Sequence, residues 1–262
     1  MISRRKFIRQ IGTIGLGATT FSLISNQVYG NKQKKYMISR PKVLFFDVNE
    51  TLLDLTAMKA VIASYLNGEK ELLDLWFSTM LHHSLVMSAA GQYAHFGQIG
   101  AAALQMVGAA KGIHISKEEG EKAILQALRS LPPHPDVSEG LIRLKEAGFT
   151  LVSFTNSSKE GVKQQLMNAN LLELFDERLS VEEVGVFKPF KEAYEWAARQ
   201  MGVKAHEAML IAAHGWDIAG ALWAGWQAAF IHRPGKQLFP LAPQPQLQAS
   251  DLKQIAELIL KQ

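Results

Sequence analysis

The sequence predicts an α/β fold in which helices flank a parallel sheet, with an α-helical cap inserted after the first strand. Short apolar runs of strand length alternate with helical stretches from residue 42 onward, a pattern typical of parallel sheets. The segment from about 56 to 133 is far too long for a simple crossover between the first two runs. A hydrophobic content of 48% with 20% charged residues is ordinary for a globular enzyme.

The strands are predicted from apolar runs that are bounded by polar residues or turn signals. Residues 43–46 form a continuous apolar run that ends at Asp47, as expected of a strand buried on both faces. Residues 150–154 form a second run after a helix predicted over 137–147, which Gly148 ends. Three more strands are predicted at 178–181, 208–213 and 228–232, separated by helices at 159–169, 190–202 and 216–225.

The long insertion between the first two strands is predicted to be helical. Its helices are expected near 55–66, 69–90, 96–111 and 118–130, before Pro132 and Pro133. An insertion at this point lies above the carboxyl ends of the strands, where open α/β folds bind ligands. We therefore expect a cap at 56–133 over a core formed by 37–55 and 134–262, with a last helix at 251–260.

The first 36 residues contain the excess positive charge of the chain. The chain has 28 basic and 24 acidic side chains, but residues 1–36 hold seven basic and no acidic ones, which leaves 21 basic against 24 acidic. A basic surface for nucleic acid is therefore not expected. The sequence has no cysteine, which excludes disulfides and thiolate catalysis.

Residues 1–36 are also predicted to be an export leader. The run Ser3-Arg4-Arg5-Lys6-Phe7-Ile8 resembles a twin-arginine signal, and a moderately apolar stretch follows at 11–24. We expect the twin-arginine export machinery to carry the protein to the periplasm, with the leader either removed or kept as a membrane anchor. The alternative is that the protein starts near Met37.

The strongest chemical signal is Asp47 at the end of the first predicted strand. A carboxylate at this position, followed by a turn and by Thr51, points a nucleophile out of the sheet. An isolated Asp after a strand is usually a turn or helix-capping residue, but three later motifs follow in order. They are a hydroxyl residue closing the next strand (Thr155), a Lys before a helix (Lys188) and an acidic residue after a later strand (Asp217).

These four motifs resemble those of the haloacid dehalogenase superfamily across residues 42–235, which implies a Rossmann-like core. Phosphatases of this superfamily carry an Asp two residues after the nucleophile, whereas this chain has Asn49, whose amide does not exchange a proton near neutral pH. Asp217 is also a lone carboxylate where Mg²⁺ prefers several oxygen ligands. Both differences resemble the metal-independent L-2-haloacid dehalogenase branch, as does Tyr194 six residues after Lys188.

The resemblance implies displacement of halide from carbon. Asp47 attacks the halogen-bearing carbon of a short 2-haloacid and forms an ester, which water hydrolyses to a 2-hydroxy acid. Lys188 keeps Asp47 ionised, and Asp217 is the general base for water. The positions expected to contact substrate are Thr51, Thr155, Asn156, Tyr194, His214 and Phe77. No metal or cofactor is expected, and the expected partners are a small organic acid and a second copy in a homodimer.

The chain departs from this branch at the expected halide site. Dehalogenases of the branch carry an Arg after a Trp early in the cap, but Trp76 is followed here by Phe77. In the fourth motif, His214 stands where Asn is usual. Unless another cap residue contacts the halide, turnover of 2-chloropropionate is expected to be slow or absent. The candidates for such a contact are the polar residues along the cap helix, namely His82, His83 and Gln92.

Two alternative functions remain open from the sequence. One is a phosphatase with an unusual site, which requires Mg²⁺, and the other is a small-anion-binding protein without catalysis. His82, His83 and His95 are poor metal ligands as a group, because adjacent helical residues point to different faces.

Overall fold

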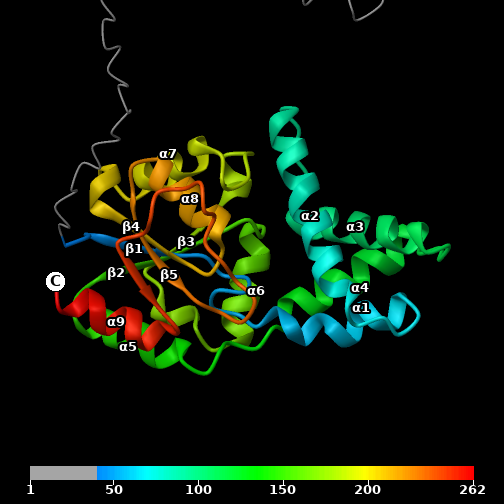
Figure 1. Ribbon diagram of the computed structural model, residues 1–262, viewed down its shortest axis with the longest axis horizontal. Coiled ribbons are helices and arrows are strands. Elements are labelled where there is room, and N and C mark those ends of the chain that lie inside the picture. The colour runs from blue at the N-terminus through cyan, green and yellow to red at the C-terminus, as the bar shows by residue number, and fades with distance from the viewer. Residues whose placement is uncertain (1–39) are drawn as a thin grey trace, which may run out of the picture. The chain divides into compact units, whose positions relative to one another are not determined.

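A six-stranded parallel sheet forms the centre of the protein, with the strand order β3-β2-β1-β4-β5-β6 (Figure 1). The computed structural model describes residues 40–262, so the predicted leader lies outside the described residues. The strands are β1 (Val43–Phe46), β2 (Thr150–Thr155), β3 (Glu177–Ser180), β4 (Ala208–Ala212), β5 (Gln227–Ile231) and β6 (Leu247–Ala249). The predicted α/β fold class is therefore confirmed.

The central strands are buried on both faces because helices cover the sheet on each side. Every residue of β1, β4 and β5 is buried, which explains their continuous apolar sequences. The helices α5 (Val137–Glu146) and α9 (Leu252–Leu260) pack together on one face, while α7 (Lys191–Gln200) and α8 (Gly215–Trp223) lie on the other (Figure 1). Helix α6 (Lys159–Asn168) packs beside β3.

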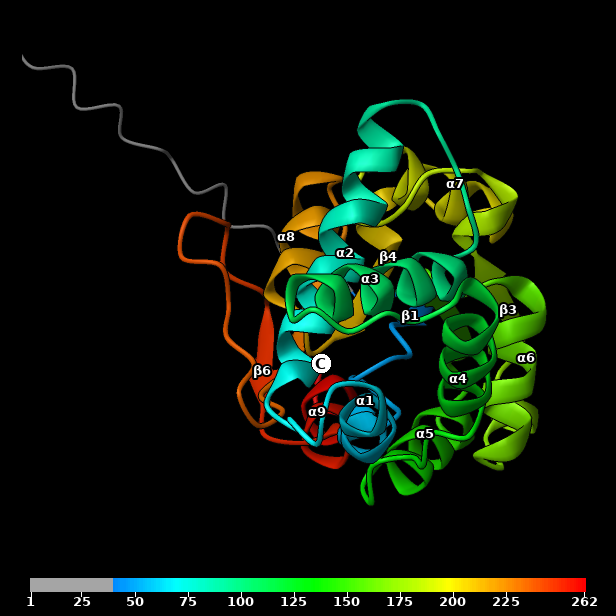
Figure 2. The ribbon, with the colours of Figure 1, turned by 90° about the vertical axis from the view of Figure 1, so that its right-hand side faces the viewer.

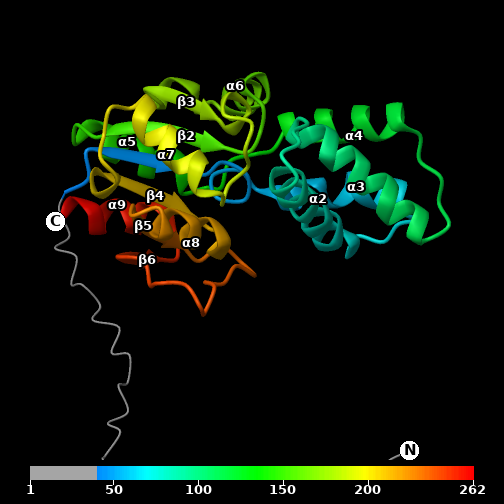
Figure 3. The same cartoon turned by 90° about the horizontal axis from the view of Figure 1, so that it is seen from above.

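The segment between β1 and α5 is helical. It contains α1 (Lys59–Tyr65), α2 (Leu72–Ala89), α3 (Phe96–Ala110) and α4 (Lys117–Arg129). These helices lie beyond the carboxyl ends of β2 and β3 (Figure 3). In the view of Figure 2, they lie between the viewer and the strands. Within residues 40–262, no helix combines the length and hydropathy that crossing a bilayer requires.

Small residues allow the helices of the cap to approach closely. A Cβ added at Gly100 of α3 would lie 2.7 Å from the sulfur of Met80 and 3.3 Å from the Trp76 ring, both on α2. The Trp76 indole N–H donates to the Gly100 carbonyl at 2.8 Å. The contact between α2 and α3 therefore depends on glycine at this position, and it holds α2 in place beside the core.

Candidate active site

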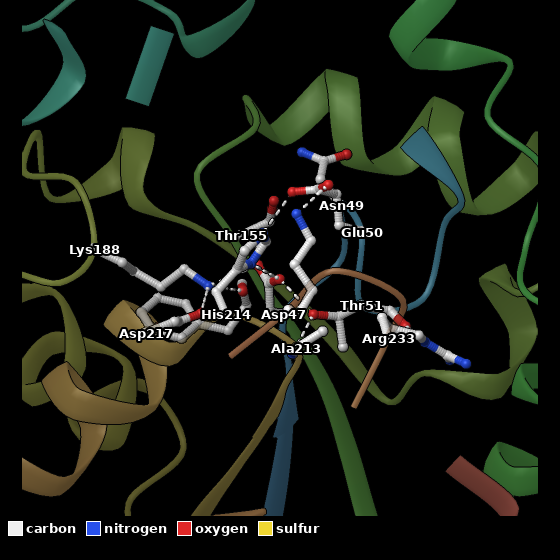
Figure 4. A network of polar contacts seen from close by, with 12 residues as sticks. Asp47, Asn49, Glu50, Thr51, Thr155, Lys188, Ala213, His214, Asp217 and Arg233 are labelled. Carbon is white, nitrogen blue, oxygen red and sulfur yellow. Dashed lines mark hydrogen bonds and ion pairs between the residues drawn. The ribbon is translucent and has the colours of Figure 1, made fainter. Parts of the chain in front are cut away.

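Asp47 lies directly after β1, where its carboxylate is buried and held in place. Its backbone N–H donates to the Ile211 carbonyl at 3.1 Å, which extends the pairing of β1 with β4 by one residue. The Thr51 hydroxyl donates to Asp47 Oδ2 at 2.7 Å and accepts the Ala213 N–H at 2.9 Å (Figure 4). Thr51 therefore orients the nucleophile, because its own hydroxyl is oriented by the loop after β4.

Lys188 neutralises the centre of the site. Its side chain is completely buried, and Nζ donates to Asp47 Oδ1 at 3.0 Å, Asp217 Oδ2 at 2.6 Å and the Phe154 carbonyl at 2.9 Å. Burial would lower the pKa of Lys188, but the two carboxylates raise it above its ordinary value. All three N–H donors of a charged ammonium are thus used.

Asp217 lies in the first turn of α8, and its carboxylate accepts hydrogen bonds from two side chains. While Lys188 contacts Oδ2, the Tyr194 hydroxyl donates to Oδ1 at 2.5 Å. Asp217 is fully buried, and burial raises its pKa although Lys188 opposes the shift. Tyr194 approaches this closely because residue 220 is glycine: an added Cβ would lie 2.5 Å from the Tyr194 hydroxyl oxygen.

His214 connects Asp47 to a second carboxylate that the sequence analysis did not identify. Its Nδ1 lies 3.0 Å from Asp47 Oδ2, and its Nε2 lies 2.8 Å from Glu50 Oε2. Ionised carboxylates only accept hydrogen bonds, so both ring nitrogens carry protons. Burial would lower the pKa of His214, but hydrogen bonds and charge from Asp47 and Glu50 raise it to about 9. His214 is therefore an imidazolium at neutral pH.

Glu50 is itself held by a lysine from the loop after β5. Lys236 Nζ lies 2.5 Å from Glu50 Oε1. Burial would raise the pKa of Glu50, but His214 and Lys236 lower it. The backbone of Glu50 has φ 62, in the left-handed region that non-glycine residues seldom adopt. No sequence motif marked Glu50 or Lys236, since a charged turn residue and a loop lysine usually face solvent.

Two cationic side chains, Lys188 and His214, hold Asp47 ionised. Burial alone would raise the pKa of Asp47, but Lys188 and His214 outweigh it and keep the pKa well below its ordinary value. Asp47 Oδ2 accepts from Thr51 and His214, whereas Oδ1 accepts only from Lys188 among the described residues. Oδ1 is therefore the oxygen that retains a lone pair for attack.

A cavity of about 430 Å³ opens beside His214. The His214 ring stacks with two aromatic rings: its centroid lies 5.9 Å from that of Phe77 and 5.0 Å from that of Trp216, at interplanar angles of 19° and 25°. Phe77 comes from α2, so the cap and the core both contribute to the cavity. Its lining consists of Phe77, Ser78, Leu81, Ala213, His214, Gly215, Trp216, Gly235, Lys236, Gln237, Leu238, Phe239 and Pro240.

The loop after β5 lies against the start of α8. The Gln237 carbonyl and the Phe239 amide pack against the Cα of Gly215, where a Cβ would overlap them. Glycine at 215 therefore allows the loop after β5 to lie directly on the first residue of α8.

Three of the residues predicted to contact substrate make hydrogen bonds within the protein. The Thr155 hydroxyl accepts the Ser157 N–H at 3.1 Å, and Asn156 Oδ1 accepts the Lys188 N–H at 3.0 Å. Together with Tyr194, these residues do not line the cavity. They position the loops that carry the charged groups. Of the predicted set, Phe77 and His214 do line it, and Thr51 holds the nucleophile.

The candidate replacement contacts along the cap helix do not line the cavity. His83 Nδ1 pairs with the Thr79 carbonyl of its own helix at 3.0 Å, and His82 lines a separate apolar groove with Pro189 and Phe190. Gln92 is exposed. None of the three lines the cavity beside Phe77, because they lie one or more helical turns farther along α2 or beyond its end. Two cationic side chains lie near Phe77 instead: Lys236, whose Nζ lies 5.8 Å from the ring centroid, and the His214 imidazolium.

Asn49 faces away from the nucleophile. Its Nδ2 donates to Ser157 Oγ at 3.1 Å, and its Oδ1 accepts from Gln165 Nε2 at 2.8 Å. The amide thus ties the turn after β1 to α6. Among residues 40–262, no group of three or more His, Asp or Glu side chains is arranged to hold a metal ion.

Comparison with known proteins gives one consistent result. Residues 41–225 match the family model described as haloacid dehalogenase-like hydrolase. (S)-2-haloacid dehalogenase 1 of Pseudomonas sp. (strain CBS-3) is 31% identical over 82% of this chain and 95% of its own length. (S)-2-haloacid dehalogenase H-109 of Pseudomonas putida is 28% identical over 83% of this chain and 97% of its own length. The L-2-haloacid dehalogenase structure from Xanthobacter autotrophicus has a TM-score of 0.79 at 22% identity, covering 84% of this chain and 98% of that one. The chain therefore belongs to the haloacid dehalogenase-like hydrolase family.

Proposed function

We propose that this hydrolase releases halide from a short (S)-2-haloacid through a covalent ester on Asp47. The observation that carries the proposal is the ionised, buried Asp47, held by Lys188 on one oxygen and by Thr51 and His214 on the other. The named activity of the relatives, (S)-2-haloacid dehalogenase, supports the same reaction.

The reaction has two displacements. Asp47 Oδ1 attacks the carbon bearing the halogen, the carbon–halogen bond breaks, and halide leaves with inversion at carbon. Water then adds to the Asp47 carbonyl carbon, and the bond from that carbon to the ester oxygen breaks to release a 2-hydroxy acid. Each step has a lower barrier than direct attack of water on the haloacid.

Positive charge on the cavity wall supports binding of an acidic substrate. Lys236 and His214 both line the cavity. Phe77 occupies the position where the resemblance leads one to expect an arginine, and the Lys236 ammonium lies over its ring. In this proposal Lys236, whose ammonium carries three N–H donors, attracts the substrate carboxylate and the departing halide through charge-assisted hydrogen bonds. Both N–H donors of His214 already contact Asp47 and Glu50, so His214 contributes only its positive charge.

The test combines halide release with isotope labelling. Purified protein is incubated with (S)-2-bromopropionate in ¹⁸O water under single-turnover conditions, and label is expected in Asp47 before it enters the product. Asp47→Asn is expected to abolish halide release while leaving the circular dichroism spectrum unchanged. Label that enters the product directly would exclude the covalent route. Hydrolysis of phosphate esters that depends on Mg²⁺ would instead identify a phosphatase, and ligand binding without turnover a small-anion-binding protein.

Export and assembly are further parts of the proposal. The twin-arginine-like run at Arg4 and Arg5 supports passage to the periplasm. Replacement of both arginines by lysine is expected to hold the protein in the cytoplasm of fractionated cells, and an unchanged distribution would favour a start near Met37. The homodimer stays a prediction, which light scattering of the purified protein tests.

A further inference from the structure

We propose that the His214 imidazolium and the Thr51 hydroxyl form the oxyanion hole for hydrolysis of the Asp47 ester, and that Glu50 is a positioning residue that keeps His214 charged. The inference rests on the covalent route proposed above, and it assigns a step to two residues that the route itself leaves unassigned.

The two donors converge on one oxygen of the nucleophile. Thr51 Oγ lies 2.7 Å and His214 Nδ1 lies 3.0 Å from Asp47 Oδ2. When Oδ1 forms the bond to substrate carbon, Oδ2 becomes the carbonyl oxygen of the ester. Attack of water on the carbonyl carbon then moves an electron pair onto Oδ2. Donors within 2.7–3.1 Å of such an oxygen are the geometry that stabilises a tetrahedral intermediate.

Two aromatic rings that stack on His214 hold its imidazole ring in place. Phe77 and Trp216 both stack on the imidazole at small interplanar angles. Because Glu50 accepts from Nε2, the ring has a fixed orientation before substrate arrives. An oxyanion hole acts efficiently when its donors are preorganised in this way.

Esterification removes the negative charge of Asp47, which is one of the two charges that keep His214 protonated. The charged groups that face His214 are Asp47 at the end of β1 and Glu50 in the following turn, with Lys236 behind Glu50 and Lys188 behind Asp47. The elements packed against the ring contribute Phe77 and Trp216, which are uncharged. Once the ester has formed, Glu50 is thus the remaining anion in contact with the ring. Without it, the buried imidazole would lose its proton when the charge is needed.

Atoms and protons balance through the second step. One proton of the attacking water reaches the leaving oxygen of the 2-hydroxy acid, and the other leaves the newly formed Asp47 carboxyl group for solvent. His214 keeps its proton throughout. The net products are a 2-hydroxy acid, halide and one proton.

The first experiment removes the donor. Full-length wild type and His214→Ala are mixed with (S)-2-bromopropionate, and bromide release and intact-protein mass are followed together. Loss of an oxyanion-hole donor typically slows the step by about 10²–10³-fold. The variant is expected to release one equivalent of bromide and then accumulate protein that carries a propionate ester on Asp47. His206→Ala, on an exposed turn before β4 at the opposite edge of the sheet, serves as the matched control and is expected to accumulate no ester.

The second experiment tests the charge of His214. The hydrolysis rate of the wild-type ester is expected to fall as rising pH deprotonates His214. In Glu50→Gln this fall is expected at a pH lower by about one unit or more, since an opposite charge in hydrogen-bond contact shifts a pKa by 1–3 units. Glu207→Gln, whose ion pair with Lys42 lies at the far edge of the sheet, is expected to keep the wild-type profile.

The outcomes separate the two proposals. Bromide release by wild type with no ester accumulation in His214→Ala, or a Glu50→Gln profile that matches wild type, overturns the oxyanion-hole assignment alone. If neither protein releases bromide from any haloacid, the proposed function fails and this inference fails with it. A loss of folded His214→Ala is detected by circular dichroism, in which case the pH profile of Glu50→Gln decides.

Discussion

Lys188→Met tests whether the centre of the site is held together by one buried charge. The substitution keeps an apolar stem of similar length but leaves Asp47, Asp217 and the Phe154 carbonyl without the donor they share. Removing one partner of a buried ion pair typically costs about 3–5 kcal/mol of unfolding free energy. If Asp217 takes up a proton instead, the cost is about 1.4 kcal/mol for each unit by which the solution pH exceeds the pKa of Asp217 in the unfolded chain, so the cost falls as the pH is lowered.

Urea denaturation at pH 7.5 and pH 5 measures this effect and its sign. In the variant, burial keeps the pKa of Asp217 above its unfolded value, so the folded state binds more protons than the unfolded state as pH falls. The stability deficit relative to wild type is therefore expected to be smaller at pH 5 than at pH 7.5. Lys191→Met, three residues away, is the matched control because Lys191 is exposed and pairs only with Glu195 across one helical turn. It is expected to leave the stability unchanged. A Lys188→Met deficit below about 1 kcal/mol, or one that grows toward pH 5, would refute the reasoning.

Three further predictions follow from the site. Haloacid turnover, measured by halide release, is expected to survive exhaustive EDTA treatment, because the described carboxylates near Asp47 are bound by cationic side chains. Recovery of a lost activity by added Mg²⁺ would argue for a phosphatase. Gly220→Ala is expected to destabilise the protein by about 1–3 kcal/mol in urea denaturation, since the new Cβ would lie 2.6 Å from Pro189 Cβ. This cost is expected to exceed the gain from the better helix propensity of alanine, and a more stable variant would contradict this packing. Lys236→Gln is expected to raise KM for haloacids more than it lowers kcat, and an unchanged KM would remove Lys236 from substrate binding.

The sequence predicted the central strands β1, β4 and β5 because they are buried on both faces and their sequences are therefore largely apolar. β6 (Leu247–Ala249) was missed, since it is a three-residue edge strand of partly exposed residues after a proline-rich loop. Its neighbour α9 was predicted because it is long enough to show a helical pattern.

The same contrast applies to the site. The convergence of Lys188 and Asp217 on Asp47 was predictable because each residue belongs to a motif at the end of a strand. The contacts of Glu50 with His214 and Lys236 were not, since they join a turn to loops more than 160 residues away. Pairings of this kind follow from how the loops pack. No local pattern in the chain records them.

The contact between Gly215 and the loop after β5 limits where the cavity can be changed. Main-chain atoms of Gln237 and Phe239 rest on Gly215, so any side chain at 215 would displace this loop. The cavity is also lined by side chains from α2, namely Phe77, Ser78 and Leu81. Libraries intended to broaden or narrow the range of acids accepted are therefore best confined to these three positions, with glycine retained at 215.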